Sequence, residues 1–237
     1  KMVRDFEALG YTTVYKVLNG IHYGVPQKRQ RVFIISIRND VMDEIGMPWM
    51  LASSIYPEPR IEEEPTIEDA IGDLRDDEEN MVEAHELCEI MKKGAKYKWL
   101  KRLPKNPEKV VSVGDDVVKP WYEKVIRHRA KWGKEVPELK NSFFQSRRVP
   151  WHQASHTLSE QGLQTSLAVH LHASEDRVFT TKESKRLMTL PEDYILTGTL
   201  NEQLARIGLM VAPMCMKYVA DSIYENILKP YKEKKGE

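Results

Sequence analysis

Apolar residues at helical spacing predict a short helix near the start of the chain, followed by a strand. Three apolar side chains recur at every third position over residues 2–9, and Gly10 ends this helix. Residues 11–18 are rich in β-branched and aromatic side chains, which favour a strand. The Asn19-Gly20 pair that follows is typical of a turn.

A second strand is predicted over residues 31–37. The apolar run from Val32 to Ile37 is consistent with a strand that is buried on both faces. Four prolines lie within residues 40–65, and they predict an irregular connection after this strand.

Capping residues and helical periodicity predict the later helices. One begins at Thr66, whose hydroxyl can cap a helix with two acidic residues in its first turn. Another has Thr180 as its cap and Glu183 completing a capping box. Further helices are expected around 81–93, over 121–132, and after Pro213 to about residue 228. The last of these has one apolar face, made of Val219, Ala220, Ile223 and Ile227.

Regularly spaced polar side chains lie just before the second strand. After a Gly-Val-Pro turn, side-chain alternation places Gln27, Arg29 and Arg31 on one side of the chain and Lys28 and Gln30 on the other. The planar fork of arginine suits a phosphate or the carbonyl edge of a base, so two arginines on one side indicate a polar pocket. A charged edge strand that discourages sheet pairing is the alternative interpretation.

Composition indicates a globular protein of one large or two small domains. The 237 residues are 41% hydrophobic and 30% charged, and the net charge is zero. The charge is unevenly distributed, because residues 62–89 are mostly acidic and residues 92–148 are basic, which indicates a basic face on one region. Within the basic region, residues 121–132 mix basic and aromatic side chains, as phosphate contact and base stacking require. An amphipathic helix that buries its aromatic side chains would give the same pattern.

Several classes of protein are not favoured by the sequence. Cys88 and Cys215 fit no disulfide or metal spacing, which indicates a reducing compartment. No apolar run approaches the roughly 20 residues that span a bilayer, and no signal peptide is seen. We therefore expect a cytoplasmic protein without a membrane partner. His170 and His172 alternate on a predicted strand with no cysteine near them, so no metal site is expected.

Four blocks in this order resemble DNA (cytosine-5) methyltransferases. The Gly-Val-Pro-Gln-Lys-Arg-Gln-Arg-Val-Phe-Ile-Ile stretch is similar to the family's Gln-Arg-x-Arg block. Residues 154–162 resemble its Thr-Leu region, and residues 177–194 resemble its Arg-x-Leu-Thr-x-x-Glu-x-x-Arg-Leu-x-x-x-Pro block. Residues 205–217 are similar to its final Gly-Asn-x-Val-x-Pro block, although Leu209 stands where Asn is usual. Residues 75–150 are unmatched, as expected for a variable recognition region.

The resemblance implies an α/β fold. It would be the C-terminal part of a Rossmann-like S-adenosylmethionine-dependent methyltransferase sheet plus a mixed α+β target-recognition domain. The implied division is residues 1–56 as C-terminal strands of the catalytic domain, 57–200 as the target-recognition domain, and 201–237 as a closing helix that returns to the catalytic domain.

The implied function is DNA cytosine-5 methylation within restriction-modification, in a prokaryotic or phage-encoded protein associated with the nucleoid. Its partners would be double-stranded DNA and a missing N-terminal catalytic half, in the same polypeptide or in a separate subunit. Blocks for donor binding and for the Pro-Cys nucleophile normally precede the arginine block and are not present here. Cys88 and Cys215 lack the Pro-Cys context, so they are interpreted as packing residues. A non-catalytic DNA-binding module derived from such an enzyme, or an unrelated α/β interaction domain, are the alternatives.

The resemblance also implies roles for particular residues. Arg31 would stabilise charge on the cytosine ring, Arg29 would hold the nucleotide, and Gln27 would support them. Backbone groups of Leu209 and Met210 would contact S-adenosylmethionine. The residues expected to contact DNA are polar or basic and comprise Thr157, Ser159, Arg127, Arg129, Lys131, Arg147 and Arg148.

Overall fold

The structure, a computed structural model, describes residues 1–60, 62–94, 97–112, 146–159 and 170–236. The chain divides into two units. Unit 1 comprises Lys1–Pro65, Met188–Leu190 and Val211–Glu237, and unit 2 comprises Thr66–Leu187 and Pro191–Met210. These boundaries differ from the predicted 56/57 and 200/201, and the three residues 188–190 return to unit 1 before the chain re-enters unit 2. The roles that the resemblance gives to the domains stay predictions.

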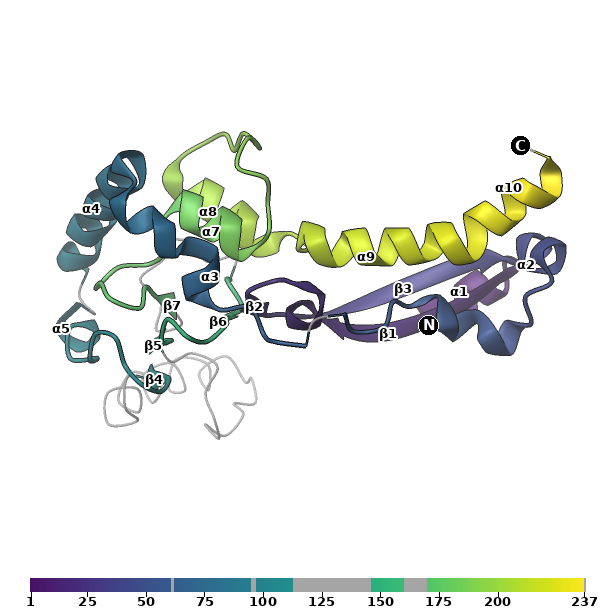
Figure 1. Ribbon diagram of the computed structural model, residues 1–237, viewed down its shortest axis with the longest axis horizontal. Coiled ribbons are helices and arrows are strands. Elements are labelled where there is room, and N and C mark those ends of the chain that lie inside the picture. The colour runs from purple at the N-terminus through teal and green to yellow at the C-terminus, as the bar shows by residue number, and fades with distance from the viewer. Residues whose placement is uncertain (61, 95–96, 113–145, 160–169, 237) are drawn as a thin grey trace, which may run out of the picture. The chain divides into compact units, whose positions relative to one another are not determined.

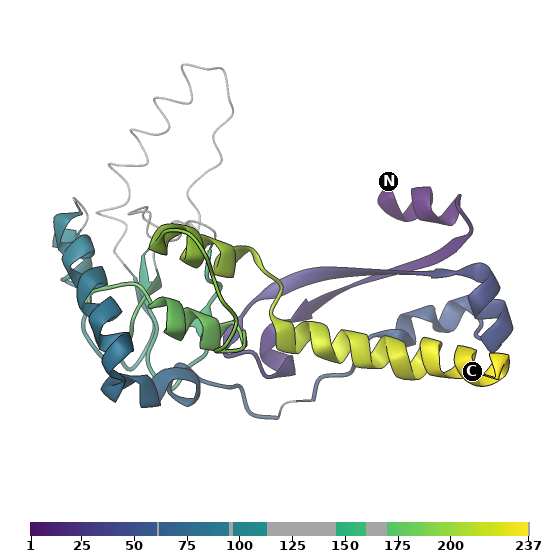
Figure 2. The same ribbon diagram turned by 90° about the horizontal axis from the view of Figure 1, so that it is seen from above.

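The centre of unit 1 is an antiparallel pair of strands, β1 (Tyr11–Asn19) and β3 (Gln30–Arg38). They pair continuously from Tyr11 opposite Arg38 to Asn19 opposite Gln30, and they lie side by side in both views (Figures 1 and 2). The short helix α1 (Met2–Glu7) precedes them, and Gly10 adopts φ +84°, which ends it as expected. The sequence pattern therefore predicts α1, β1 and β3 at the positions where they occur.

The strands are joined by a ten-residue corner rather than by a tight turn. A 3-10 turn, η1 (Gly20–Tyr23), and the two-residue strand β2 (Gln27–Lys28) occupy this corner. Gly24 follows η1 with φ +78°, where a side chain would be strained. The Asn19-Gly20 pair starts the corner but does not form the whole turn.

One face of the β1–β3 hairpin is open in unit 1. Side chains directly opposite one another in antiparallel strands share a face, and this register pairs Tyr15 with Ile34 and Val17 with Val32. All four are exposed, with Tyr15 68% and Val32 60% accessible. The expectation that residues 32–37 are buried on both faces is therefore wrong in this structure, because only the opposite face is covered. Membership of the hairpin in a larger Rossmann-like sheet stays a prediction.

Helices occupy much of the connection that was expected to be irregular. After β3 come α2 (Asn39–Ile45) and the 3-10 helix η2 (Trp49–Ile55), with Gly46 at φ +70° ending α2. The prolines lie before and after these helices rather than inside them, so they do not interrupt backbone hydrogen bonding. The hydroxyl of Tyr56 lies 2.9 Å from the carbonyl oxygens of both Val14 and Phe33, which fixes this segment against the covered face of the hairpin.

A long C-terminal helical rod covers the same hairpin (Figure 1). It consists of α9 (Pro213–Ile223), the π-helical turn η4 (Tyr224–Leu228) and α10 (Lys229–Lys235). Pro230 has no N–H and its ring clashes with the carbonyl of the residue four positions earlier, which accounts for a widened turn before it. Cys215, Val219 and Ile227 are buried at four-residue multiples. Ala220 is exposed, so its predicted place on the buried face is wrong.

Unit 2 begins with capped helices. The first is α3 (Ile67–Ile71), followed by the 3-10 turn η3 (Gly72–Asp76), α4 (Glu78–Lys93) and α5 (Tyr97–Leu100). The Thr66 hydroxyl accepts from the Asp69 N–H, and the Asp69 carboxylate accepts from the Thr66 N–H, which confirms the predicted cap.

Short strands and two further helices complete the described part of unit 2. Strands β4 (Val111–Ser112), β5 (Arg147–Arg148) and β7 (His170–Leu171) form a sheet in that order, and β6 is Ser155–His156. Helix α7 (Thr181–Leu187) has the predicted capping box between Thr180 and Glu183. Helix α8 (Leu200–Leu209) was not predicted, although Thr199 and Glu202 form a second capping box.

Two apolar clusters hold unit 2 together. One is Leu87, Met91, Leu100, Leu103, Leu171, Val178 and Leu204. The other is Ile67, Ile71, Leu74, Val149, Phe179 and Leu187. Among the described helices of both units, none is long and apolar enough to cross a lipid bilayer.

Candidate functional site

The corner between β1 and β3 fixes the position of the arginine-containing stretch. The N–H of Gly20 donates to the carbonyl of Arg29 at 2.9 Å, which closes the corner. A Cβ on Gly20 would lie 3.2 Å from the Cβ of Val25, so a larger residue would push the corner open. The sequence places glycine where two backbone segments must approach closely.

Burial follows the alternation expected from the sequence. Gln27 and Arg29 are 0% and 2% exposed, Arg31 is half-buried, and Lys28 and Gln30 are exposed. The Arg29 guanidinium donates through Nη1 to Oε1 of Gln27 at 3.4 Å, a long hydrogen bond. Gln27 and Arg29 therefore point into unit 1 rather than into solvent.

Two guanidinium groups meet in a small pocket. Its described lining carries Arg29 and Arg31 and no carboxylate, and comprises Leu18, Gly20, Arg29, Arg31, Phe33, Val211, Ala212 and Cys215. Burial, together with the positive charge of Arg31, lowers the pKa of Arg29 to about 10. A buried arginine beside a second arginine is stabilised by a negative or strongly electron-rich group, so this pocket suits an anion or a carbonyl edge.

The pocket is only part of a binding site for a base. The volume that water can enter is about 10 Å³, which is about one water molecule. A base bound against these arginines would need further walls from elsewhere. Arg29 and Arg31 would form one polar wall of such a site.

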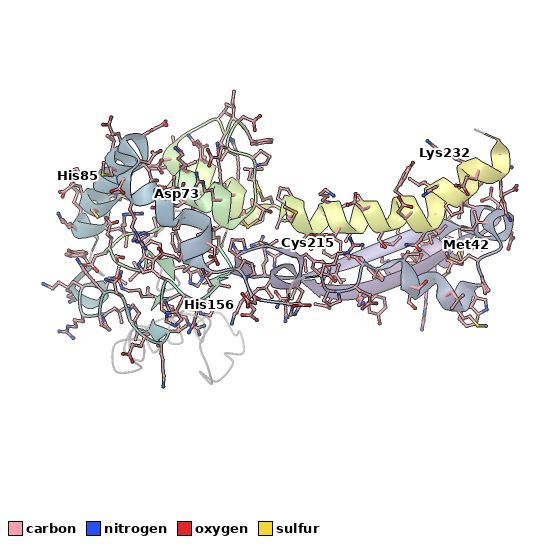
Figure 3. The ribbon with its side chains drawn as sticks, viewed as in Figure 1. Met42, Asp73, His85, His156, Cys215 and Lys232 are labelled. Carbon is pink, nitrogen blue, oxygen red and sulfur yellow. The ribbon has the colours of Figure 1, made fainter. Side chains whose placement is uncertain are left out.

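Neither cysteine has the properties of a nucleophile in this structure. Cys215 lies on the side of α9 that faces the hairpin (Figure 3), and burial raises the pKa of its thiol to about 11. Burial also raises the pKa of Cys88 on α4, with the charge of Glu175 acting in the same direction. Both sulfurs are thiols at neutral pH, which supports the interpretation of Cys88 and Cys215 as packing residues.

The residues expected to contact DNA are placed differently from one another. Ser159 is exposed, while Thr157 and Arg147 are half-buried. Arg127, Arg129 and Lys131 lie outside the described residues. These six stay predictions.

Arg148 does not fit a phosphate contact. Its side chain is 0% exposed, and its guanidinium donates to the carbonyls of His172 and Glu175 and to the carboxylate of Asp176. A guanidinium enclosed by three internal acceptors cannot reach solvent-exposed DNA, so Arg148 is withdrawn from the expected DNA contacts. Its role in this structure is to hold the loop after β7.

A buried ionic network anchors α7 in unit 2. The Arg177 guanidinium donates to both carboxylate oxygens of Glu183, at 2.7 and 2.9 Å, and both side chains are almost fully buried. The Asn80 amide donates to Glu183 at 3.1 Å, and the Thr180 hydroxyl donates to Asn80. Burial, the largest single influence, raises the pKa of Glu183, but the hydrogen bond and charge of Arg177, the charge of His172 and the Thr180 N–H together outweigh it, and the pKa is lowered.

His156, His170 and His172 of unit 2 are packed as aromatic residues. His170 stacks on His156 with ring centroids 5.5 Å apart, and His172 meets Trp151 edge-on at 5.0 Å. Within the part of the chain that the structure describes, no three His, Cys, Asp or Glu side chains are grouped so as to hold a metal ion.

A family model described as C-5 cytosine-specific DNA methylase matches residues 1–225. Type II methyltransferase M.Eco47II of Escherichia coli is 28% identical to this chain over 216 residues, covering 84% of the chain and 43% of that protein. Type II methyltransferase M.Sau96I of Staphylococcus aureus is 26% identical over 224 residues, covering 94% of the chain and 45% of that protein. The chain thus spans about half the length of these curated relatives.

A crystal structure of a "putative DNA modification methyltransferase encoded within prophage" (E. coli) has a similar fold. The TM-score is 0.55 at 18% sequence identity, and the match covers 96% of this chain and 64% of that one. At this identity the likeness supports the fold, which is a methyltransferase-like mixture of helices and strands.

Proposed function

The chain belongs to the C-5 cytosine-specific DNA methylase family, and we propose that it is the part of a DNA cytosine-5 methyltransferase that recognises the target and walls the cytosine pocket with arginines. The observation that carries this proposal is the buried Gln27–Arg29 pair beside the half-buried Arg31. The whole enzyme would act in restriction-modification in the cytoplasm of a prokaryote, and it would be encoded by the prokaryote or by a phage.

The two arginines are given different roles. Arg31 is half-buried and remains accessible, so it would face the carbonyl side of the cytosine ring and stabilise charge that develops on it. Arg29 lies deeper and would hold the sugar-phosphate of the same nucleotide. Gln27 would orient Arg29 through the hydrogen bond between them. A cytosine in a duplex must leave the base stack to reach such a pocket.

The methyl donor of this family, S-adenosylmethionine, does not find a complete site in the described residues. Leu209 is 63% exposed and its side chain has no polar atom to bind the donor's charged groups. Contacts from the backbone of Leu209 and Met210 stay part of the proposal, but most of the donor site would come from the rest of the enzyme. No step of methyl transfer is therefore derived from residues of this chain.

The open hairpin face supports a missing portion of the enzyme as the partner. Tyr15, Val17, Val32 and Ile34 expose a contiguous apolar surface on two strands, and soluble proteins usually cover such surfaces. The relatives are about twice as long as this chain, so the same sheet face would be covered by their additional residues. This portion would supply the nucleophilic cysteine and the donor site.

The experiment that tests the proposal measures transfer of labelled methyl groups from S-adenosylmethionine to duplex DNA. The chain would be assayed alone and then with an N-terminal half supplied from a relative. No methyl transfer is expected from the chain alone, and methyl transfer is expected once the N-terminal half is added. Methyl transfer by the chain alone would contradict the inference that this chain lacks the nucleophilic cysteine. The variants Cys88→Ser and Cys215→Ser would then show which cysteine acts as the nucleophile.

A non-catalytic recognition module is the second candidate. It is favoured by Leu209, which places an apolar and exposed side chain where the family usually has a polar one. Retained DNA binding without methyl transfer in either assay would support this module over the enzyme.

A further inference from the structure

Three consecutive residues from the recognition part of the chain lie in unit 1. Leu187 ends α7 in unit 2, Met188–Leu190 belong to unit 1, and Pro191 returns to unit 2. We call Met188–Leu190 the insert segment. Met188 is 0% exposed and Leu190 is 7% exposed, so the insert segment is part of the core of unit 1.

The first residue of the insert segment contacts the arginine cluster through Gln27. The Gln27 amide donates through Nε2 to the sulfur of Met188 at 3.4 Å, while its Oε1 accepts from Arg29. The oxygen of the Gln27 amide faces the donor Arg29, so its NH2 group faces the Met188 sulfur, which is a weak acceptor. Met188 therefore fixes the orientation in which Gln27 can hold Arg29.

The second residue holds the opposite wall of the pocket. The Thr189 hydroxyl accepts from the N–H of Met214 at 3.1 Å, in the first turn of α9. This N–H has no partner within its own helix, so Thr189 acts as a cap from a distant part of the chain. Ala212, directly before α9, and Cys215, within its first turn, line the arginine pocket.

Thr189 makes this contact from an unfavourable backbone conformation. Its φ is +56°, which a β-branched residue rarely adopts. Residues held in such conformations are kept there by surrounding contacts and occur where geometry matters for function. On its N-terminal side the insert segment follows directly from α7, which the buried Arg177–Glu183 pair anchors within unit 2.

We propose, on the basis of the proposed function, that Met188 and Thr189 are positioning residues for the arginine pocket. Met188 fixes Arg29 through Gln27, and Thr189 fixes the first turn of α9 that closes the pocket. Both residues act through others and do not touch the substrate.

The test replaces the two contacting groups without changing the volume much. Met188→Leu removes the sulfur acceptor, and Met42→Leu is its matched control, a buried methionine of α2 in the same unit (Figure 3). Thr189→Val removes the hydroxyl and keeps the β-branch, while Thr189→Ser keeps the hydroxyl. Methionine-to-leucine exchanges are well tolerated in cores, so Met188→Leu and Met42→Leu are expected to fold.

The first readout needs no activity. The nitrogen-proton resonance of the Arg29 guanidinium, assigned with Arg29→Lys, is expected to shift in Met188→Leu and to stay in place in Met42→Leu. An equal response in both variants would overturn the proposal. This readout decides the matter even if no form of the protein transfers methyl groups, so failure of the proposed function is distinguished from failure of the positioning role.

The second readout uses the enzyme assembled with its N-terminal half. Misplaced contacts to a reacting group reduce turnover, and kcat is expected to fall about 10-fold in Met188→Leu and Thr189→Val, with KM for DNA unchanged. Thr189→Ser is expected to retain the wild-type kcat. A kcat that is unchanged in Met188→Leu, or that falls as much in Met42→Leu, would refute the role.

Discussion

At the residue scale, burial separates arginines that hold the structure from an arginine that can meet a ligand. Arg148 and Arg177 are 0% and 1% exposed and donate to carbonyls and carboxylates of their own unit. Arg31 is half-buried and lines a pocket with Arg29. The sequence alone does not distinguish these arginines. Only their tertiary partners show which of them form internal ion pairs and which can contact a ligand.

Arg31→Ala is expected to reduce methylation far more than DNA binding in the assembled enzyme. A guanidinium that stabilises charge in the transition state contributes about 100-fold to kcat, whereas DNA affinity comes from many phosphate contacts. Single-turnover methyl transfer and DNA titration at one salt concentration measure both. Lys28→Ala, at an exposed position three residues earlier in the chain, is the control. Equal losses in activity and binding for Arg31→Ala would contradict the assigned role.

Glu183→Gln is expected to destabilise unit 2 by about 3–5 kcal/mol, because it leaves the Arg177 guanidinium buried without its counter-charge. Urea unfolding followed by signals from unit 2 measures the change. Glu89→Gln breaks an exposed pair with Lys92 and is expected to have no measurable effect. Similar midpoints for the two variants would show that the buried pair is not needed.

At the element scale, local signals located most of the elements but not their burial. Caps at Thr66 and Thr180 and the alternation around Arg29 depend on neighbours in sequence, and the structure agrees with them. The sequence reasoning does not predict α8, although Thr199 and Glu202 have the spacing of a capping box, and it does not predict α2, because the nearby prolines favour an irregular connection. The open hairpin face has no local signal, because an apolar run looks the same whether or not something covers it.

The positioning role of Met188 could not be predicted from sequence at all. The residue lies 161 positions from Gln27, and no periodicity or spacing relates the two. The resemblance points to the arginines because they stand in a recognisable block. The methionine is identified only by its tertiary contact.

Val32→Lys is expected to weaken association through the open hairpin face. The chain alone is expected to self-associate through this face, and a lysine there would have to lose its hydration on binding, which weakens association at least about 10-fold. Light scattering at several concentrations measures the mass, and mixing with the N-terminal half measures assembly. Val82→Lys, at an exposed valine of α4 in unit 2, is the matched control. The same masses for both variants would exclude the hairpin face as the interface.

At the scale of the whole molecule, the two units carry buried titratable groups that respond to opposite ends of the pH range. In unit 2, burial lowers the pKa of His170 and of His172 to about 4. In unit 1, burial raises the pKa of Cys215 to about 11 and raises that of Tyr23. The neutral thiol stabilises unit 1 below the ordinary thiol pKa, and this contribution is lost as the pH rises through about 11.

Unit 2 is expected to lose stability as the pH falls from 6.5 to about 4. The folded histidines bind a proton less readily than the unfolded chain, so protonation favours unfolding, and the shift of His170 corresponds to roughly 3 kcal/mol. Urea unfolding at several pH values, followed by separate NMR signals of Leu87 and Leu18, measures the two units independently.

His170→Phe is expected to make this pH dependence shallower, because it keeps an aromatic ring against His156 and removes a titrating group. His152→Phe, at an exposed position, is expected to leave the pH dependence unchanged. An unaltered slope in His170→Phe would show that other groups govern the acid response.

The division of the chain also decides how a chimera between two such proteins would have to be spliced. Exchange of the whole continuous stretch from Thr66 to Met210 would import a foreign Met188 and Thr189 into a host that did not evolve with them. A graft in two pieces, Thr66–Leu187 and Pro191–Met210, would exchange unit 2, the proposed recognition part, and leave the host's own three residues in place. Chimeras of the second design are expected to retain more activity. Target preference could then be exchanged without changing the residues that position the arginine pocket.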